Sequence, residues 1–311
     1  MKTVFILNPK AGKGKQKEKL KEVLVKTIAE KGLDAQVYVT KYPGDATRFV
    51  RDYCRENGAA RFIACGGDGT LSEVLNGVVG FHGAELGVLP VGSGNDFCRN
   101  FPKDTAFGDV YLQAVSDAVD CDAIRYTTTV NGETLTGYCA NMFNIGFDCN
   151  VADLTQTLKN YPLLNGSMAY LAAVVGMLVK KKGANLKVEL DGEVVENGPL
   201  LLTAIANGGF CGGGVNSAPT ASINDGVMDV NVVYNISRVN FIKKFPYYSK
   251  GTHMELPDLD EFLLFKTCKK AVITPLDNTM RLCVDGEIVD AGEVTMEMMP
   301  LAVNVLVPKA R

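Results

Sequence analysis

Short apolar runs alternate with helical patterns over about the first 120 residues. The apolar runs, each of strand length, lie at 4–7, 36–40, 62–65 and 85–90. Three- and four-residue spacing of apolar positions predicts a helix over 17–31, and two further helices are predicted over 45–56 and 71–79. Asp45, which follows Pro43 and Gly44, is predicted to cap the second helix. Because strands that alternate with helices in this way usually pair in parallel, the pattern favours a parallel sheet with helices on its faces.

After about residue 122 the pattern changes to short β-rich runs separated by turns. The runs lie at 125–130, 135–145, 186–190, 200–207, 228–234, 270–274, 280–284 and 302–307. Asn-Gly and Asp-Gly pairs, typical of two-residue hairpin turns, lie between or beside them. Helical patterns interrupt the runs near 150–182 and 238–248. The chain is therefore predicted to hold a second, β-rich domain of the sandwich or barrel type.

A glycine-rich turn follows the third predicted strand. Residues 65–73 read Cys-Gly-Gly-Asp-Gly-Thr-Leu-Ser-Glu, so Gly66, Gly67 and Gly69 surround the carboxylate of Asp68. Glycine lets a phosphate or a ribose approach the backbone closely, and the N–H groups that begin the next helix would face an anion. The pattern favours a nucleotide site over the simpler alternative, a tight turn in which Asp68 caps the helix.

Two further loops follow neighbouring strands. Residues 8–12 come after the first strand, and the loop at 90–97 carries Ser93, Asn95 and Asp96. Because the carboxyl ends of parallel strands converge on one crevice, the three loops are expected to line a single pocket suited to a triphosphate. Asp96 has an alternative role as a helix cap. Neither the P-loop spacing nor the Rossmann dinucleotide fingerprint occurs in the sequence.

Two acidic turns in the β-rich part are candidates for catalysis and metal binding. Taken alone, Val284-Asp285-Gly286-Glu287 is a hairpin turn. In a kinase, a carboxylate at this turn would take the proton of the acceptor hydroxyl as a general base. Further upstream, Asp225 and nearby carbonyl groups are oxygen ligands of the kind that Mg²⁺ prefers, although a plain Asp-Gly turn explains that segment equally well.

Composition adds limits on partners and location. A formal net charge of −3 gives no sign of a nucleic-acid partner. The nine cysteines are odd in number and include no Cys-x-x-Cys pair, which favours reduced thiols in a cytoplasmic protein. The most apolar helical segment, 168–179, is well short of the roughly 20 residues that span a bilayer. It is expected to be a buried helix, or alternatively a wall of an apolar substrate site or a contact with the inner membrane face.

Together these motifs resemble those of the soluble diacylglycerol kinase/sphingosine kinase family of lipid kinases, in particular its bacterial DagK/YegS-like branch. The resemblance covers essentially the whole chain, with the motifs in the expected order. Thr40 resembles a nucleotide-contacting threonine of the family, and 66–72 resemble its Gly-Gly-Asp-Gly-Thr signature. Residues 90–97 resemble a Pro-x-Gly-Thr-x-Asn-Asp-Phe motif, with Ser93 where threonine is usual.

The resemblance implies site residues at the matching positions. The implied nucleotide-binding residues are Asn8, Pro9, Lys10, Ala11, Gly12, Thr40, Gly66, Gly67, Asp68, Gly69, Thr70, Leu71, Ser72, Ser93, Asn95 and Asp96. The implied Mg²⁺ ligands are Asp225 and the carbonyl oxygens of Ser222 and Val227. The implied catalytic residues are Asp68, which with Asp96 is expected to organise Mg²⁺ on the phosphates, and either Asp285 or Glu287 as the base.

The resemblance also implies the fold and the reaction. A Rossmann-like α/β nucleotide domain, of the NAD kinase and phosphofructokinase type, is expected over 1–124 with a returning segment at about 296–311, and a β-sandwich acceptor domain over 125–295. The implied reaction transfers the γ-phosphoryl group of ATP, with Mg²⁺, to a lipid hydroxyl, above all that of diacylglycerol, giving phosphatidic acid. A lipid acceptor implies peripheral contact with a membrane surface. An edge strand in the β-rich domain could also pair two copies into a homodimer.

Three other functions stay open. The Gly-Gly-Asp-Gly sequence is shared with NAD kinases, the acceptor could be a soluble or polyketide-like alcohol, and a nucleotide-binding regulator would need no turnover. The Asn-Asp-Phe motif, the late Asp-Gly-Glu motif and the short apolar middle segment favour a lipid kinase.

Overall fold

The computed structural model describes residues 1–10, 15–158, 172–174, 176–177 and 183–309. Contacts within the chain divide it into two compact units. Unit 1 comprises Met1–Asp122 and Pro300–Arg311, and unit 2 comprises Ala123–Met299. Both boundaries fall inside long strands, β5 (Ala118–Val130) and β17 (Val294–Leu306), so each of these strands contributes to both units.

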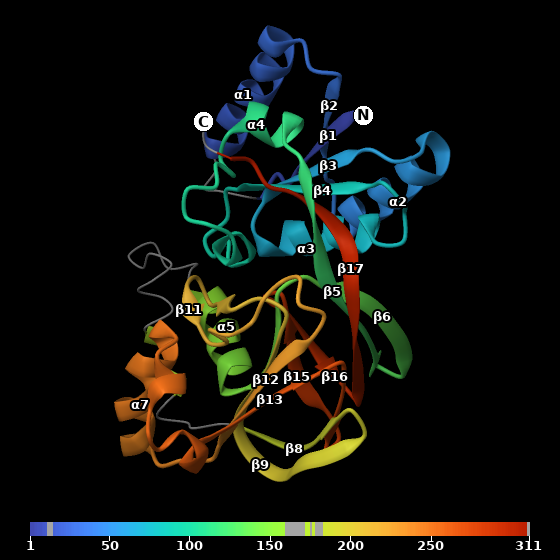
Figure 1. The fold of residues 1–311 in the computed structure, drawn as a ribbon. Coiled ribbons are helices and arrows are strands. Elements are labelled where there is room, and N and C mark those ends of the chain that lie inside the picture. Colours follow the sequence, from blue (N-terminus) through green and yellow to red (C-terminus); the bar gives the residue numbers. More distant parts are fainter. Residues whose placement is uncertain (11–14, 159–171, 175, 178–182, 310–311) are drawn as a thin grey trace. The chain divides into compact units, whose positions relative to one another are not determined.

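Unit 1 is built on a parallel sheet of short strands. They are β1 (Thr3–Leu7), β2 (Ala35–Val39), β3 (Arg61–Gly66) and β4 (Glu85–Pro90). Their order is β2-β1-β3-β4, and the end of β17 pairs in parallel with β4 on its outer side (Figure 1). Thr3 lies opposite both Ala35 and Arg61, so the strands are in step and their carboxyl ends share one edge. The three loops expected to hold a nucleotide begin at that edge.

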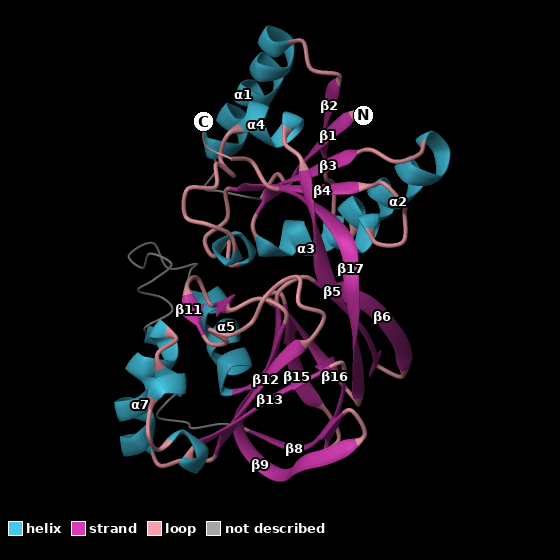
Figure 2. Ribbon diagram, in the orientation of Figure 1, coloured by secondary structure: helices cyan, strands magenta, loops and turns pink. Residues whose placement is uncertain are grey.

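Helices cover both faces of this sheet. As Figure 2 shows, α1 (Lys15–Lys31) and α4 (Val110–Val115) lie on one face, and α2 (Asp45–Asn57) and α3 (Asp68–Val78) on the other. Leu24 of α1 packs with Phe5, Ile63 and Leu89 in one apolar cluster, as the predicted spacing requires. A short 3-10 helix, η1 (Phe97–Asn100), follows the loop after β4.

The start of α2 differs from the prediction that Asp45 caps it. Gly44, at φ 82°, is the N-cap residue, and no side chain caps the helix there. Asp45 is instead the first helical residue. Its buried carboxylate accepts the N–H of Lys41 at 2.9 Å and pairs with Arg48 at 2.7 Å. Glycine suits the N-cap position because a positive φ strains residues that carry a Cβ.

Unit 2 is mainly antiparallel and surrounds an apolar core. Besides β5 and β17, its strands are β6 (Glu133–Cys139), β7 (Met142–Gly146), β8 (Ala184–Leu190), β9 (Glu193–Ala206), β10 (Phe210–Cys211), β11 (Val215–Asn216), β12 (Met228–Tyr234), β13 (Leu263–Cys268), β14 (Lys270–Pro275), β15 (Met280–Val284) and β16 (Glu287–Ala291). The main path is β16-β15-β7-β9-β8-β14-β17, with β12 joining β9 to β13. Phe143, Val188, Ile205, Val230 and Leu282 belong to the core.

Two longer helices accompany these strands, α5 (Phe147–Leu158) and α7 (Arg238–Lys250). Two short 3-10 helices, η2 (His253–Glu255) and η3 (Leu259–Glu261), follow α7. The helical pattern near 150–182 therefore starts at Phe147, and most of 168–179 lies outside the described residues. Among the helices that the structure describes, none combines the length and apolar content that a membrane crossing requires.

The apolar run predicted as one strand over 135–145 forms two strands. β6 ends at Cys139 and β7 begins at Met142. The backbone N–H groups of Ala140 and Asn141, which lie between them, donate to the carboxylate of Asp285 instead of to a neighbouring strand. The sequence pattern also left out β13, β16 and α4, which have five or six residues each.

The first turn of α5 holds a carboxyl group that makes stability depend on pH. Asp148 accepts a hydrogen bond from the Tyr248 hydroxyl at 3.5 Å, and burial raises its pKa to about 7. Because the folded state holds this proton more tightly than the unfolded chain does, stability falls as the pH rises from about 4 to about 7. Between pH 5 and pH 8 we expect a loss of about 2–3 kcal/mol in the free energy of unfolding from this group.

Chemical unfolding of Asp148→Asn at these two pH values checks this expectation. The variant should lose most of the pH-dependent drop, because its carboxamide does not titrate. Asp290→Asn, a change at an exposed carboxylate of the same unit, serves as the control and should keep the drop. An equally steep drop in Asp148→Asn would contradict the assignment.

Candidate active site

The glycine turn lies where β3 passes into α3. Gly66 ends the strand, Gly67 is the N-cap residue, and Asp68 is the first residue of the helix. The alternative in which Asp68 caps α3 is therefore wrong. A Cβ on Gly66 would lie 2.2 Å from the Thr70 hydroxyl oxygen, and one on Gly67 would lie 3.2 Å from the Gly92 Cα. Gly66 therefore leaves room for the Thr70 side chain, and Gly67 allows the loops after β3 and β4 to pack closely together.

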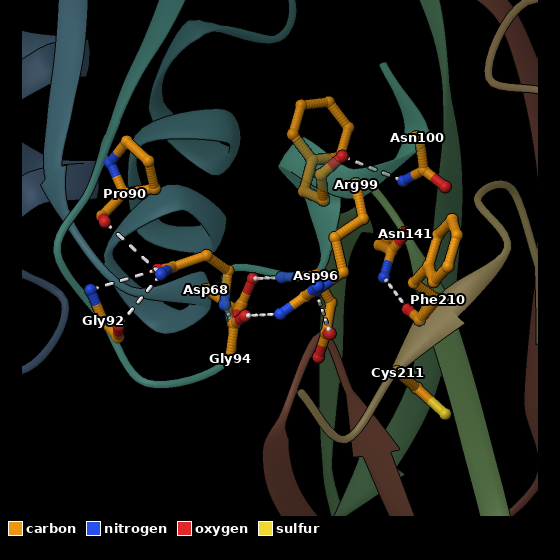
Figure 3. A network of polar contacts seen from close by, with 12 residues as sticks. Asp68, Pro90, Gly92, Gly94, Asp96, Arg99, Asn100, Asn141, Phe210 and Cys211 are labelled. Carbon is orange, nitrogen blue, oxygen red and sulfur yellow. Dashed lines mark hydrogen bonds and ion pairs between the residues drawn. The ribbon is translucent and has the colours of Figure 1, made fainter. Parts of the chain in front are cut away.

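Asp68 joins the glycine turn to the loop after β4. One carboxylate oxygen accepts the N–H of Asn95 at 2.8 Å, and the other accepts the N–H of Asp96 at 2.8 Å. Figure 3 shows Asp68 directed at the part of the loop that carries Gly94 and Asp96. Each oxygen keeps a further lone pair, so Asp68 can brace the loop and still accept another hydrogen bond.

Asn95 fixes the rest of that loop from within. Its backbone has φ 54°, and its side-chain oxygen accepts the N–H of Gly92 at 3.0 Å. Its side-chain nitrogen donates to the carbonyl oxygens of Pro90 and Gly92 at 3.3 and 2.9 Å. Asp96, which is 8% exposed, pairs with Arg99 at 3.4 Å and occupies the N-cap position of η1 without a capping hydrogen bond from its side chain. The loop is thus held by its own polar side chains.

The loops after β1 and β2 reach the same edge of the sheet. Asn8 donates from its side chain to the Thr70 hydroxyl at 3.0 Å, which links the loop after β1 to α3. The N–H of Thr40 donates to the carbonyl oxygen of Leu7 at 3.0 Å. Unit 1 therefore brings Asn8, Thr40, Thr70 and the Asp68–Asn95 contact to one edge, as the parallel arrangement predicts.

The remaining predicted nucleotide residues differ in their access to a ligand. Pro9 is half-buried, Lys10 and Ser93 are exposed, and Ser72 is half-buried. Leu71 is 2% exposed within the core, so it can contact a nucleotide only through its backbone. Gly69 lies in the first turn of α3. Ala11 and Gly12 lie outside the residues that the structure describes.

Gly92 offers a direct test of this packing. A Cβ at this position would lie 2.4 Å from the Gly67 Cα and 2.8 Å from the Asn95 side-chain oxygen, so Gly92→Ala must push the two loops apart. Because backbone cannot yield as a side chain can, we expect a loss of about 1–3 kcal/mol in stability and at least about ten-fold weaker ATP binding. Calorimetry with ATP and thermal unfolding measure both effects.

Gly108→Ala is the matched control for this substitution. Gly108 lies in the same unit, and an added Cβ there meets nothing within 4 Å. ATP binding and stability should be close to those of the unsubstituted protein. Equal ATP affinities in the two variants would show that the contact between the loops does not shape the site.

The second predicted motif forms a tight hairpin in unit 2. Val284 pairs with Glu287 across the turn made by Asp285 and Gly286, whose φ angles are 46° and 91°. Such positive angles at both central positions are why an Asp-Gly pair occupies this turn. The hairpin predicted from Asp-Gly is therefore confirmed, while its role in the reaction is a separate question.

Asp285 is held by four donors. Its oxygens accept the N–H groups of Ala140, Asn141 and Met142 at 2.8, 3.0 and 3.1 Å, and the Cys139 thiol at 3.1 Å. The residue is 8% exposed, and burial raises the pKa of its carboxyl group while the N–H donors oppose the rise. This carboxylate has most of its lone pairs engaged, so it ties the hairpin to the segment between β6 and β7.

Glu287 differs from Asp285 in its exposure and in its hydrogen bonding. It is the first residue of β16, it is exposed, and its carboxylate makes no hydrogen bond or ion pair within the described part of the chain. A general base needs a free lone pair within reach of the proton that it takes. Of the two predicted candidates, Glu287 has the more accessible carboxylate.

The predicted metal loop lies between β11 and β12. Ser222 donates to the Asn224 side-chain oxygen at 3.0 Å, and the N–H of Val227 donates to one oxygen of Asp225 at 3.2 Å. Asp225 is exposed, and one carboxylate with nearby carbonyl oxygens is a donor set that fits Mg²⁺ with water completing its shell. Among the described residues, no group of three or more His, Cys, Asp or Glu could hold a metal ion.

Comparison with known proteins decides the family. Residues 2–123 match the model of the diacylglycerol kinase catalytic domain, and residues 141–307 match that of the YegS C-terminal NAD kinase beta sandwich-like domain. The chain is 32% identical over 235 residues to a protein of Escherichia fergusonii named "Probable lipid kinase YegS", covering 74% of this chain and 73% of that protein. The chain belongs to the diacylglycerol kinase/YegS family of lipid kinases. This confirms the resemblance and the predicted α/β plus β-sandwich fold class.

Full-length relatives agree with this assignment. A protein of Bacillus subtilis named "Diacylglycerol kinase" is 26% identical over 315 residues, covering 99% of this chain and 96% of that one. A crystal structure of a diacylglycerol kinase from Bacillus anthracis shares the fold, with a TM-score of 0.69 at 20% identity over 98% of this chain and 96% of that one. The protein is therefore a lipid kinase, a phosphotransferase that uses ATP and an alcohol acceptor.

The structure adds residues to the candidate site that the motifs alone did not reveal. Ala140, Asn141 and Met142 bind Asp285 through their backbone, and Cys139 binds it through its thiol. The sequence gives no clear signal for these contacts, because they use backbone N–H groups and because the polar Asn144 of the same run lies inside β7.

Proposed function

We propose that this lipid kinase transfers the γ-phosphoryl group of ATP to the free hydroxyl of diacylglycerol, forming phosphatidic acid. The observation that carries the substrate is the match over 99% of the chain to the Bacillus subtilis protein named "Diacylglycerol kinase". The braced glycine loops of unit 1 and the exposed carboxylate on the hairpin of unit 2 that Asp285 anchors supply groups that such a transfer needs.

In this proposal the loops of unit 1 bind ATP. The backbone N–H groups of the glycine turn and the start of α3 receive phosphate oxygens, because a helix N-terminus attracts negative charge. Asp68 keeps the loop 92–96 in place through Asn95 and Asp96. Asn8, Thr40, Thr70 and Ser93 offer polar side chains along the same edge. Phosphoryl transfer depends mainly on such positioning and on charge stabilisation.

The acceptor hydroxyl loses its proton to Glu287 in this scheme. Asp285 holds the hairpin that carries Glu287, since its own carboxylate is occupied by donors from the segment 139–142. The exposed Glu287 side chain can approach a bound hydroxyl directly. Asp285 is then a positioning residue and Glu287 the base.

Mg²⁺ has two candidate places in the proposal. Asp225, with the carbonyl oxygens of Ser222 and Val227, would hold one ion by the donor set described above. Asp68 and Asp96 would organise Mg²⁺ on the phosphates, directly or through water. When bound to ATP, Mg²⁺ neutralises charge on the phosphate oxygens.

A substrate panel tests the assignment. The purified protein is incubated with MgATP and, separately, diacylglycerol, sphingosine, phosphatidylglycerol and NAD, and labelled phosphate is followed into each acceptor. We expect the fastest transfer to diacylglycerol. If another lipid were phosphorylated faster, that lipid and not diacylglycerol would be the preferred substrate. ATP binding without transfer to any acceptor would point to a regulator and contradict the proposal.

A further inference from the structure

Helix α7 of unit 2 exposes an apolar and basic face. Val239 is 60% exposed, Ile242 58% and Tyr247 46%, although such side chains usually lie in the core. They belong to one helix of 13 residues, which Figure 1 draws in orange at the outer edge of unit 2. A cluster of exposed apolar side chains on one element usually marks a surface that something covers.

Helix α7 has one side buried against unit 2 and an opposite side exposed to solvent. Phe241 and Tyr248 are 7% and 6% exposed and belong to the apolar cluster beneath α7. Six exposed residues follow three- and four-residue spacing along the opposite side, here called the outward face: Val239, Ile242, Lys243, Pro246, Tyr247 and Lys250. Arg238 and Asn240, in the first turn, are exposed as well. The outward face therefore combines apolar residues with cations.

Charge decides which partner this face suits. The helix carries Arg238, Lys243, Lys244 and Lys250 and contains no acidic residue. The neighbouring segment 255–261 has four acidic residues, Glu255, Asp258, Asp260 and Glu261. Of these, Asp258 pairs with Lys244, which lies on the flank of α7 and not on its outward face. The outward face itself is positive and apolar, which complements an anionic phospholipid surface.

We infer that the outward face of α7 docks the protein on anionic phospholipid membranes. Val239, Ile242 and Tyr247 enter the boundary between headgroups and acyl chains, while Lys243 and Lys250 contact lipid phosphates. The inference rests on the proposed function, because a kinase whose acceptor is a membrane lipid must meet the bilayer. Helix α7 is the element of this chain that makes the contact with the bilayer.

Vesicle binding of paired variants tests the inference. Cosedimentation is measured with phosphatidylcholine vesicles that contain or lack phosphatidylglycerol, at low and high salt. We expect Val239→Ser with Ile242→Ser to weaken binding at least about ten-fold, since less apolar surface is buried. Lys243→Gln with Lys250→Gln should weaken binding by a similar factor on the anionic vesicles alone, and the effect should shrink at high salt.

Matched controls come from exposed residues elsewhere in unit 2. Val194→Ser with Leu276→Ser removes similarly exposed apolar side chains, and Lys269→Gln removes an exposed cation. These variants should bind vesicles like the unsubstituted protein. Equal binding of the α7 variants and these controls would overturn the inference. Unchanged vesicle binding together with conversion of a dimer to a monomer, seen by sedimentation velocity, would assign the face to a second copy and also overturn it.

A soluble acceptor separates this inference from the proposed reaction. Turnover of a short-chain, monomeric diacylglycerol should be the same in the unsubstituted protein and in the α7 variants, because α7 takes no part in the chemistry. If the unsubstituted protein phosphorylated no diacylglycerol at all, the proposed substrate would be wrong while the vesicle result stood. If the unsubstituted protein phosphorylated diacylglycerol and the α7 variants bound vesicles as well as it does, the proposed reaction would stand and the docking face would be wrong.

Discussion

Asp68→Asn should lower kcat/KM for ATP by about 10²–10⁴ while the protein remains folded. The carboxylate of Asp68 accepts the N–H groups of both Asn95 and Asp96 at 2.8 Å. A carboxamide has one acceptor oxygen, so its NH₂ group would face one of these N–H donors. Hydrogen bonds to a charged group contribute about 1.5–3 kcal/mol each, and losing them lets the loop 92–96 leave its place. Steady-state kinetics and thermal unfolding measure the two effects.

Control measurements separate bracing of the loop from organisation of Mg²⁺. Asp104→Asn replaces an exposed carboxylate of the same unit and should leave kcat/KM unchanged. If Asp68 acts mainly as the brace, raising the Mg²⁺ concentration will not restore activity to Asp68→Asn. Recovery at high Mg²⁺ would show that metal binding is its main role. Near-normal activity at ordinary Mg²⁺ would mean that the nucleotide lies elsewhere.

The architecture of unit 1 was predictable because each of its main strands and helices can be recognised from a short stretch of sequence, and strands and helices alternate regularly. Each strand appears in the sequence as a short apolar run and each of the longer helices as a separate helical segment, and parallel pairing then brings the loops to one edge without further assumptions. Contacts between side chains and distant backbone carry no such pattern. The bonds of Asp68 to Asn95 and Asp96 cross 27 and 28 residues, and the motifs contained all three residues without linking them.

In unit 2, contacts between side chains and distant backbone are even harder to predict from the sequence. Asp285 accepts the Ala140 N–H across 145 residues, and this contact ends one strand and precedes the next inside an apolar run that reads as continuous. The sequence also treats Asp285 and Glu287 as equal candidates, because they belong to one motif. Burial separates them: Asp285 is 8% exposed, whereas Glu287 is exposed. Only the folded hairpin shows which carboxylate is free.

Because Asp285 is buried and Glu287 is exposed, substitutions at these two positions should have different effects, although both residues belong to one motif. Glu287→Gln should lower kcat by about 10²–10⁴, the usual contribution of a general base, with the free energy of unfolding unchanged. Asp285→Asn should lower the free energy of unfolding by about 1–3 kcal/mol, because its NH₂ group would face a buried N–H donor. Denaturant unfolding and kinetics on the same preparations distinguish the two outcomes.

Glu133→Gln, at an exposed hairpin carboxylate of unit 2, should change neither quantity. If Asp285→Asn kept its stability but lost turnover, while Glu287→Gln kept turnover within a few-fold, then Asp285 would be the base despite its four donors. The proton would then have to go to Oδ2, which accepts the Ala140 N–H alone, because Oδ1 already accepts the Cys139 thiol and the N–H groups of Asn141 and Met142.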